Sequence, residues 1–508
     1  MQSKRDQTQA HLFVMGRLSA GLLRSEPDSP DGPVSRTARG TRTGLLVGLF
    51  LGLVIALYGV VVPGGATGWR TAGTMVVVKG TGARYLYLGG ALHPVLNETS
   101  AKLVAGAQLA VDEVDASSLA GTQRGAPIGI VGAPDSLPDA GQLTAAPWLA
   151  CSVPAQSGQG GQGGSGSALL SLVVGASAQG ARLTPGQGLL VRASDGSEYL
   201  LWRGQRLPLG DPAGVVQALG YGSAVPAGTV TAGGQAAPVV PAFLAALPEG
   251  HELAYPDVPG RGAAGPPLAA RPTRVGQLFT GLDGSRYLLT QSGLVPVDTT
   301  EFDLLRGDPR TQSTAYGGAA VVAAQIGAQD LLVHSAPAAV AAAWSGAGLP
   351  TTPPTLVSPG RGQAVCADVQ VGGDGPSSSV AVLPAASVTG QAPAVQPGVR
   401  ASCTPADLVL VRPGGGALVR ALSAAGTGST DYLVTDGGVG YPIASQATLQ
   451  QLGYSGTTPT AVPQALLDLL PTGPSLDVSL MAGGGVVSEP QASPLCGSGA
   501  ATRAEQKR

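Results

Sequence analysis

The sequence predicts an α+β protein with a single transmembrane helix near its N-terminus and a large outer part that contains four related segments. Three observations lead to this fold class. Residues 44–62 are apolar and long enough to cross a bilayer. Glycine and proline are abundant, at 78 and 42 of 508 residues, which indicates many turns and short strands. A pattern of Tyr-Leu, glycine and proline then recurs four times.

The tail before the apolar stretch, residues 1–43, predicts an amphipathic helix. It opens with a capping-box pattern from Ser3 to Asp6, and apolar side chains then recur at helical spacing. Because a tail of this length cannot form a core, the apolar stripe must lie on a membrane surface or dock onto a partner. We favour a partner, because the polar face carries few basic residues. The expected docking residues are Leu12, Phe13, Met15, Arg17, Leu18 and Leu22. The prolines expected to end this helix and form a linker are Pro27, Pro30 and Pro33.

The apolar stretch 44–62, GLLVGLFLGLVIALYGVVV, contains no charge and would reach about 28 Å as a helix. The tail before it holds seven Lys/Arg against four Asp/Glu, which predicts a cytoplasmic N-terminus and an extracytoplasmic C-terminal part. Tyr58 and Trp69 are expected to form an interfacial aromatic pair. The alternative is a cleaved secretory signal. Such signals have a short leader and an apolar core of about 7–15 residues, so an uncleaved anchor fits better.

Composition and cysteine usage narrow the function classes. The net charge is −2, so there is no electrostatic footprint for nucleic acid. All four cysteines follow the apolar stretch and none has metal-ligand spacing: Cys151, Cys366, Cys403 and Cys496. An even count in an oxidising compartment predicts two disulfides, with three possible connectivities. Buried free thiols are the alternative.

The internal repeat has a fixed spacing. Each copy has a Tyr-Leu pair, a glycine about five residues on, and a proline before an apolar residue. The Tyr-Leu run predicts a strand, the glycine a turn, and the second apolar run the partner strand of a hairpin. The tyrosine–proline pairs are Tyr85 and Pro94, Tyr199 and Pro208, Tyr287 and Pro296, and Tyr432 and Pro442.

A helix start follows each predicted hairpin. The capping residues Asn97 to Ser100, Asp211, Asp298 and Ser445 precede short apolar stripes. Each repeat is therefore expected to be a hairpin plus a short helix, with room for another strand. One such unit cannot bury its own face and must pack on something else.

The chain between the repeats predicts a central β-rich domain. Residues 125–190 and 310–400 contain Val/Ala/Leu strands broken by Pro and Gly, with Cys151 in the first and Cys366 in the second. A disulfide between these two would join distant stretches into one domain, and Cys403–Cys496 would then pin the C-terminal segment beside the fourth repeat.

The expected boundaries follow the chain in order. They are 1–43 tail, 44–62 transmembrane helix, 66–120 repeat 1, 121–190 first segment of the central domain, 191–225 repeat 2, 226–270 Pro/Gly-rich linker, 271–310 repeat 3, 311–400 second segment of the central domain, 401–455 repeat 4, and 456–508 C-terminal segment and tail.

Signals for catalysis are poor. The dipeptide Gly-Lys never occurs, so the sequence has no Walker A loop, and H-E-x-x-H, G-x-S-x-G and EF-hand patterns are absent too. Gly158-x-Gly160-x-x-Gly163 matches a dinucleotide fingerprint only by letters, inside a Gln/Gly/Ser run. The histidines are scattered: His11, His93, His251 and His334. We therefore predict no catalytic, cofactor-binding or metal residue, and no cofactor.

Several motifs resemble the EccB family, the bitopic membrane component of actinobacterial type VII (ESX) secretion systems. The opening SKRDQ…H-x-F-x-x-x-RL covers Ser3 to Leu18, and the anchor lies near residue 45. Pro-Gly-Gly precedes Trp69, and G-A-R-Y…L-x-P-V-L-N runs from Gly82 to Asn97. L-P-E-G at 247–250 and P-G-R-G at 259–262 also agree, so the resemblance covers nearly the whole chain.

The resemblance implies a fold and a set of partners. The fold is an elongated extracytoplasmic part of four repeat domains, similar to a phage-lysin cell-wall-binding subunit, around a central β-rich domain. The implied partners are an EccC-type motor ATPase, EccD, EccE, a nearby mycosin protease, other copies of the chain and the lipid bilayer of the inner (cell) membrane. The system exports small helical WXG100-type proteins.

The resemblance also implies the role. It makes the chain a structural core subunit that bridges cytoplasmic and inner-membrane components to an outer platform. Some family members carry an ATPase label, which makes an extracytoplasmic nucleotide hydrolase the first alternative, and the missing Gly-Lys argues against it here. A cell-wall protein that binds peptidoglycan is the second alternative.

Overall fold

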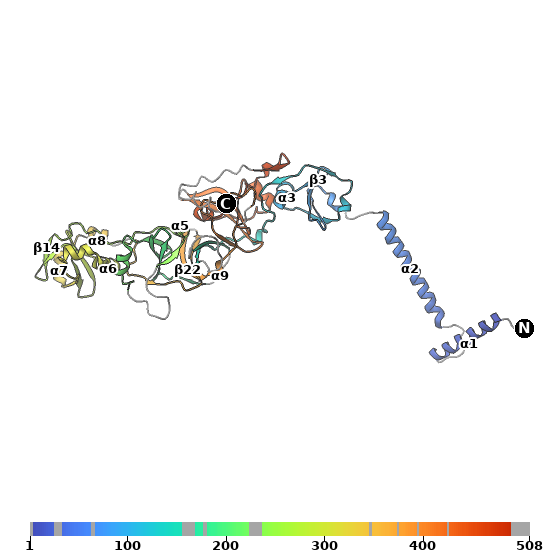
Figure 1. The fold of residues 1–508 in the computed structure, drawn as a ribbon, viewed down its shortest axis with the longest axis horizontal. Helices are drawn as coiled ribbons and strands as arrows, with labels where there is room; N and C mark the ends of the chain where they lie inside the picture. The colour runs from blue at the N-terminus through green and yellow to red at the C-terminus, as the bar shows by residue number, and fades with distance from the viewer. Residues whose placement is uncertain are drawn as a thin grey trace. The chain divides into compact units, whose positions relative to one another are not determined.

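A computed structural model describes residues 4–24, 33–61, 67–154, 168–175, 180–222, 236–344, 348–372, 375–393, 396–423 and 426–488. The chain divides into two compact units. One contains residues 1–92 and 110–124, and the other contains residues 93–109 and 125–508. The main elements are labelled in Figure 1.

Two helices form the N-terminal part, α1 (Lys4–Arg24) and α2 (Pro33–Val61). The prediction that helix begins only at residue 44 was wrong, and so was the assignment of Pro33 to a linker. Proline is favoured in the first turn of a helix, where its missing N–H costs nothing, and no further proline occurs before the apolar stretch. Pro27 and Pro30 lie outside the described residues. By length and composition, Thr37–Tyr58 is the one candidate membrane span among the described residues.

The first β-sheet lies in the first unit, with strand order β4-β1-β2-β3-β5. Strand β1 is antiparallel to β2 and parallel to β4. Its core contains Trp69, Val76 and Leu92, all nearly inaccessible to solvent. The elements are η1 (Gly68–Arg70), β1 (Met75–Val78), β2 (Arg84–Leu88), β3 (Ala91–Pro94), β4 (Val111–Val114), η2 (Ala116–Leu119) and β5 (Gln123–Arg124).

Three later sheets repeat the order of the first four strands. In each, an antiparallel three-strand meander is followed by a helix and then by a strand parallel to the first. The second sheet has β10 (Gln187–Ala193), β11 (Glu198–Trp202), β12 (Gln205–Pro208) and β13 (Ala237–Val239). The third has β16 (Leu278–Gly281), β17 (Arg286–Thr290), β18 (Gly293–Pro296) and β19 (Ala324–Ile326). The fourth has β24 (Gly416–Ser423), β25 (Gly426–Thr435), β26 (Gly440–Ile443) and β27 (Thr460–Pro463).

The structure therefore adds two strands to the hairpin-plus-helix pattern inferred from the sequence. One precedes the Tyr-Leu strand and the other follows the helix. A further parallel segment then covers the outer edge of each meander, through β5 and through isolated bridges such as Leu209 with Leu253 and Ile443 with Leu476. Covering an edge in this way satisfies backbone groups that would otherwise invite pairing with another chain.

The helices that follow the meanders pack in two pairs. Helix α3 (Glu98–Ala105) lies against α10 (Gln446–Leu452), and α4 (Pro212–Ala218) lies against α6 (Thr299–Gly307). In the first pair, Leu103 shares a core with Leu449. In the second, Leu304 shares a core with Val215. Each helix thus buries its apolar stripe against another helix and against side chains of the neighbouring sheet.

A six-stranded sheet has the strand order β23-β8-β7-β21-β22-β9. Three of its strands lie between the first and second sheets in the chain order, and the other three lie between the third and fourth. One face carries Trp148, Ala150 and Leu172, and the other carries Leu149, Cys151 and Cys366. The short helix α9 (Ala385–Val388) contacts the second face. The strands are β7 (Trp148–Val153), β8 (Leu169–Val174), β9 (Ala181–Arg182), β21 (Gln363–Gly372), β22 (Gly375–Pro384) and β23 (Leu408–Val411).

The remaining elements are short. They are β6 (Gly129–Ile130), η3 (Ala140–Gln142), α5 (Pro241–Ala245), β14 (Ala264–Leu268), β15 (Arg271–Arg274), the π-helical turn η4 (Thr311–Ala315), α7 (Ala328–His334), α8 (Ala338–Trp344), β20 (Thr355–Leu356), α11 (Gln464–Leu467), α12 (Val478–Met481) and β28 (Val486–Val487).

Several sequence boundaries differ from these elements. The described part of the expected linker 226–270 forms β13, α5 and β14, and it buries Phe243 and Leu244 in the main core. Its prolines do not loosen it, since Pro241 begins α5 at a position where proline is favoured. Strands β10 and β19, expected within the central domain, pair in the second and third sheets. Strand β27, expected in the C-terminal segment, completes the fourth sheet.

Candidate functional site

Helix α1 carries the predicted docking residues on its surface. Exposed fractions are 67% for Leu12, 56% for Leu18 and 84% for Leu22, and Phe13 and Met15 are exposed too. At about 100° per residue, the set divides between two sides of the helix. Leu12, Met15, Leu18 and Leu22 share one side, while Phe13 and Arg17 lie on the other. The apolar stripe is therefore the four-residue face, and Phe13 extends beyond it.

Helix α2 presents an apolar surface with a line of glycines. Its side chains from Leu45 to Tyr58 are largely exposed, as expected for a helix whose solvent is lipid. Gly44, Gly48 and Gly52 recur every four residues, and no atom lies within 4 Å of a Cβ built at any of them. This spacing is typical of transmembrane helices that approach another helix closely.

Trp69 does not form the expected interfacial pair with Tyr58. It is 1% exposed and meets Tyr87 edge-on, with ring centroids 5.4 Å apart, inside the first sheet. A tryptophan just beyond a membrane segment resembles an interfacial anchor in sequence, but here its large apolar surface fills a small core. The prediction for Trp69 was wrong, whereas Tyr58 is exposed on α2.

The repeat-signature residues meet within each sheet. Tyr199 lies opposite Pro208, Tyr287 opposite Pro296, and Tyr432 opposite Pro442. Tyr85 and Pro94 lie on the neighbouring strands β2 and β3. The tyrosines do not converge on one shared site. Each pair instead joins the second and third strands of its own meander, where cross-strand packing stabilises the sheet.

The capping residues end each meander and start its helix. Asn97 accepts a hydrogen bond from the Ser100 N–H, and Ser445 accepts one from the Thr448 N–H. Asp211 caps α4. Asp298 and Glu301 form a reciprocal capping box. Each cap satisfies an otherwise unpaired donor and is worth about 1 kcal/mol.

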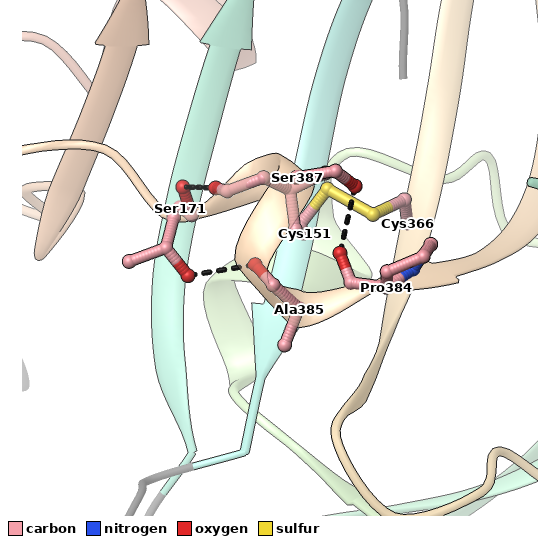
Figure 2. The surroundings of a disulfide bond; sticks show 8 residues. Cys151, Ser171, Cys366, Pro384, Ala385 and Ser387 are labelled. Atoms are coloured by element: carbon pink, nitrogen blue, oxygen red, sulfur yellow. Dashed lines mark hydrogen bonds between the residues drawn. A yellow bond between two sulfur atoms is a disulfide. The ribbon is translucent and has the colours of Figure 1, made fainter. Parts of the chain in front are cut away.

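The central sheet contains a buried disulfide. Cys151 on β7 and Cys366 on β21 are direct cross-strand partners, joined across 215 residues of sequence. Both are fully buried beneath the segment that contains α9 (Figure 2). Ser171 on β8 donates to the Val388 carbonyl, and Ser387 donates to the Pro384 carbonyl at 2.7 Å. The bond therefore links two neighbouring strands that are far apart in sequence, at the middle of this sheet.

The structure describes only one cysteine of the second predicted disulfide, Cys403. Cys403 is disulfide-bonded, and the described residues contain no free cysteine. Cys496 lies outside the described residues, so the pairing Cys403–Cys496 stays a prediction.

The buried carboxylates of Asp431 and Asp308 are paired with arginines. Arg420 on β24 donates to Asp431 on β25 at 2.6 Å and 3.0 Å, and this hydrogen bonding raises the pKa of Arg420. Arg261 donates to Asp308 at 2.5 Å and to the Pro256 carbonyl at 2.8 Å, with both charged side chains nearly buried. Such pairs are costly to break because the remaining charge would be left without a partner.

The described residues contain no group of three His, Cys, Asp or Glu side chains that could hold a metal ion. His11, His93, His251 and His334 lie on separate segments, and His93 contacts the Ala126 carbonyl at 3.0 Å. The run Gly158–Gly163 lies outside the described residues. Two pockets beside the fourth sheet share Arg400, Asp468, Leu470 and Thr472 in their walls. Residues 401–404 line the first pocket, and Tyr432 lines the second.

Comparison with known proteins decides the family. A family profile described as "Type VII secretion system ESX-1, transport TM domain B" matches residues 1–481. The chain belongs to the EccB family. The resemblance indicated by the sequence motifs is thereby confirmed.

Curated EccB relatives are between 25% and 30% identical to this chain over the residues that align. The ESX-3 secretion system ATPase EccB3 of Mycobacterium tuberculosis is 30% identical over 304 residues, 59% of this chain and 52% of the relative. In that match the chain spans about half the relative's length. The EccB3 of Mycolicibacterium smegmatis is 28% identical over 93% of this chain and 89% of its own. The ESX-2 secretion system ATPase EccB2 of M. tuberculosis is 28% identical over 94% and 95%.

Solved EccB-like structures have the same fold. A chain of an intact ESX-5 inner membrane complex matches with a TM-score of 0.57 and 21% identity, over 97% of this chain and 98% of the other. The EccB3 dimer from an ESX-3 core complex matches with a TM-score of 0.57 and 24% identity, over 80% and 98%. The EccB-like mixed α/β fold, preceded by one candidate N-terminal apolar helix, is therefore confirmed.

Proposed function

We propose that this chain is a structural core subunit of a type VII secretion membrane complex. It would join cytoplasmic and inner-membrane components to an extracytoplasmic platform for export of small helical WXG100-type proteins. The observation that carries the proposal is the EccB family match over residues 1–481, which includes an exposed helix, a candidate span and the β-sheet part.

The orientation follows from charge. Arg36, Arg39 and Arg42 lie at the start of α2, and no basic residue lies between Leu45 and Val61. Positive charge flanking a span stays cytoplasmic, so α1 belongs inside the cell and the sheets outside. An oxidising outer compartment also suits the buried Cys151–Cys366 bond.

Helix α1 is the proposed inner docking element. Its four-residue apolar face is exposed, and burying it would stabilise the complex by the hydrophobic effect. The proposed partners are an EccC-type motor ATPase, EccD and EccE, with a mycosin protease near the outer part. Other copies of the chain are included because a similar EccB3 chain was solved as a dimer.

The platform would consist of four repeat domains around a central domain. The support is the strand order shared by four sheets and the six-stranded sheet that the Cys151–Cys366 bond joins. Each repeat domain would consist of a meander, its helix and the parallel strand. The boundaries drawn from sequence would then shift so that β10, β13, β19 and β27 belong to their sheets.

A second candidate function is nucleotide hydrolysis, because the printed names of the curated relatives contain the word ATPase. A phosphate-binding loop with its lysine has no counterpart here, since Gly-Lys is absent from the sequence. Turnover by the purified full-length chain that survives further purification, and that one point change abolishes, would support the hydrolase.

The scaffold proposal is tested by the size of the native assembly. The full chain is tagged, extracted from its own membranes in mild detergent and separated on a native gel, with co-purifying proteins identified by mass spectrometry. We expect a large band that contains several membrane subunits. A monomeric band alone, at every detergent concentration tried, would overturn the proposal.

A further inference from the structure

Each of the four repeated sheets ends on one side in the parallel strand that follows its helix. These strands are β4, β13, β19 and β27, and each is the last in the strand order at its end of the sheet. The opposite edge of the third sheet is covered, because Ser335 bridges Leu294 on β18. Among the described residues, by contrast, no strand or bridge pairs with the outer side of β19. The third sheet therefore has one covered edge and one open edge.

Three of the four edge strands carry residues that discourage pairing with another chain. A charge on an edge resists burial, and a proline lacks the N–H that a partner strand would need. Strand β4 contains Asp112 and Glu113, β13 contains Pro238, and β27 ends at Pro463. Strand β19, Ala-Gln-Ile, contains neither a charge nor a proline.

The chain around β19 is uncharged as well. No Asp, Glu, Lys, Arg or Pro occurs between Arg310 and Asp330. Val322, two residues before the strand, is 69% exposed, and Gln325 within the strand is exposed too. The open edge therefore lies in a neutral surface that carries an exposed apolar side chain.

The chain along this edge is extended and held in place by the core. Val321 and Ala323 pack on one face of the third sheet, whereas Ala324 and Ile326 pack on the other. This alternation is that of a strand, and six residues of strand span about 20 Å. Since the core fixes the side chains of residues 321–326, their outer backbone groups form a preformed edge on which another strand could pair.

We propose that β19 pairs with β19 of a second copy of this chain, antiparallel and edge to edge, about a twofold axis perpendicular to the sheet. The four-stranded third sheet then continues across the axis into eight strands. Identical strands can pair in this way because an antiparallel ladder has the same pattern of bonds when read from either strand.

The charge pattern favours a second copy as the occupant. An uncharged strand meets its own copy without like-charge repulsion, whereas β4 would place two carboxylates of each copy against each other. The pairing rests on the proposed function, in which other copies of the chain are partners, and it assigns the surface through which two copies meet.

Cysteine cross-linking in membranes tests the pairing. The full chain is expressed with one cysteine substitution at a time along residues 321–326, such as Val322→Cys, and a mild oxidant converts adjacent thiols to a disulfide. We expect a covalent dimer on a non-reducing gel, strongest at one position and weaker two residues away, because pairing fixes the register of the strands. No dimer at any of the six positions, or a cross-link to a different subunit identified by mass spectrometry, would overturn the pairing.

Two controls accompany the cross-linking. The parent chain reports any dimer formed through its own cysteines. Val333→Cys places an accessible thiol on α7, where Val333 is 62% exposed and lies two residues from Ser335 at the covered edge. We expect both controls to stay monomeric. A dimer from Val333→Cys as abundant as that from the strand would contradict contact through β19.

A charge placed at the open edge should weaken the pairing. Val322→Lys gives β19 the kind of charge that β4 already has, and Val333→Lys adds the same charge away from the edge as the matched control. Each is combined with the cysteine that cross-links most strongly at a position other than 322. We expect Val322→Lys to reduce the covalent dimer several-fold and Val333→Lys to leave it unchanged. The same amount of dimer in both variants would count against pairing at this edge.

The size of the native assembly separates this inference from the scaffold role. A large native assembly without the cross-link would refute the β19 pairing and leave the scaffold role intact. A cross-linked dimer that joins no larger assembly would support the pairing and refute the scaffold role.

Discussion

At the scale of single residues, buried side chains fix the local geometry of the sheets. Tyr441 illustrates this. It is 1% exposed, and Gln396 donates to its hydroxyl at 3.2 Å. Burial raises the pKa of Tyr441 to about 12, because the phenolate would lose its hydration. The ordinary tyrosine pKa is about 10, so the folded state retains this proton more strongly than the unfolded state.

The consequence is a loss of stability at high pH. A folded-state pKa above the unfolded one gives stability that is complete below about pH 10 and is lost as pH rises toward about 12. The melting temperature of the extracytoplasmic part should therefore fall as pH rises from about 10 to about 12. Tyr441→Phe should show a smaller fall than the parent, because one titrating group is gone. An identical fall would show that Tyr441 does not ionise differently on unfolding.

Residue patterns predicted some local features and missed others, for physical reasons. The caps at Asp298 and Ser445 were predictable, because a side chain that accepts from the next turn acts locally. Trp69 was misassigned because a core and a bilayer interface both accept a large aromatic ring, and only tertiary packing separates them. The burial of Arg261 with Asp308 left no signal in sequence, since the two lie 47 residues apart.

At the scale of elements, the helix pairs explain how short repeats become stable. These helices have seven to nine residues, and helices of that length are marginal alone, so packing must supply their stability. In the pair α4 and α6, a Cβ built on Gly307 would lie 2.4 Å from the Ala218 Cβ. Glycine is therefore required for this close approach.

Gly307→Ala should destabilise the protein by roughly 1–3 kcal/mol, the usual cost of overpacking. Removing the opposing methyl group should relieve the clash, so Gly307→Ala with Ala218→Gly should recover part of the loss. The measurement is the denaturant midpoint of the transition that includes these helices. A double variant no more stable than the single one would contradict contact between these two positions.

The anchor provides a second prediction for an element. If Gly44, Gly48 and Gly52 form a helix–helix contact, then Gly48→Ile should reduce recovery of the chain in its native complex several-fold. Leu46 lies about 160° round the helix, so Leu46→Ile serves as the control. Equal recovery of both variants, each with normal membrane insertion, would show that the glycine line is not a packing surface.

Element order was partly predictable. The Tyr-Leu, glycine and proline pattern predicted four meander hairpins, because turns and alternation are local signals. The parallel strands β13, β19 and β27 were assigned elsewhere, because parallel pairing joins residues far apart and leaves no fixed spacing. The linker 226–270 was misassigned because proline content indicates turns but does not decide whether Phe243 is buried.

At the scale of the whole molecule, the proposed role of the chain is to connect components on the two sides of a membrane. The family match, the candidate span and the repeated sheets describe an EccB chain in which a candidate membrane helix precedes a large β-sheet part. In the function that we propose, the chain holds positions across a membrane, and the exposed apolar face of α1 is the contact with the components inside.

The most direct test compares Leu18→Asp with Gln9→Asp in the full chain. Both add one negative charge to an exposed position on α1, but only Leu18 belongs to the four-residue apolar face. We predict that Leu18→Asp removes most of the co-purifying membrane subunits while the Cys151–Cys366 bond still forms, and that Gln9→Asp assembles normally. Normal assembly of Leu18→Asp would contradict the docking role of α1 and, with it, the proposed bridge across the membrane.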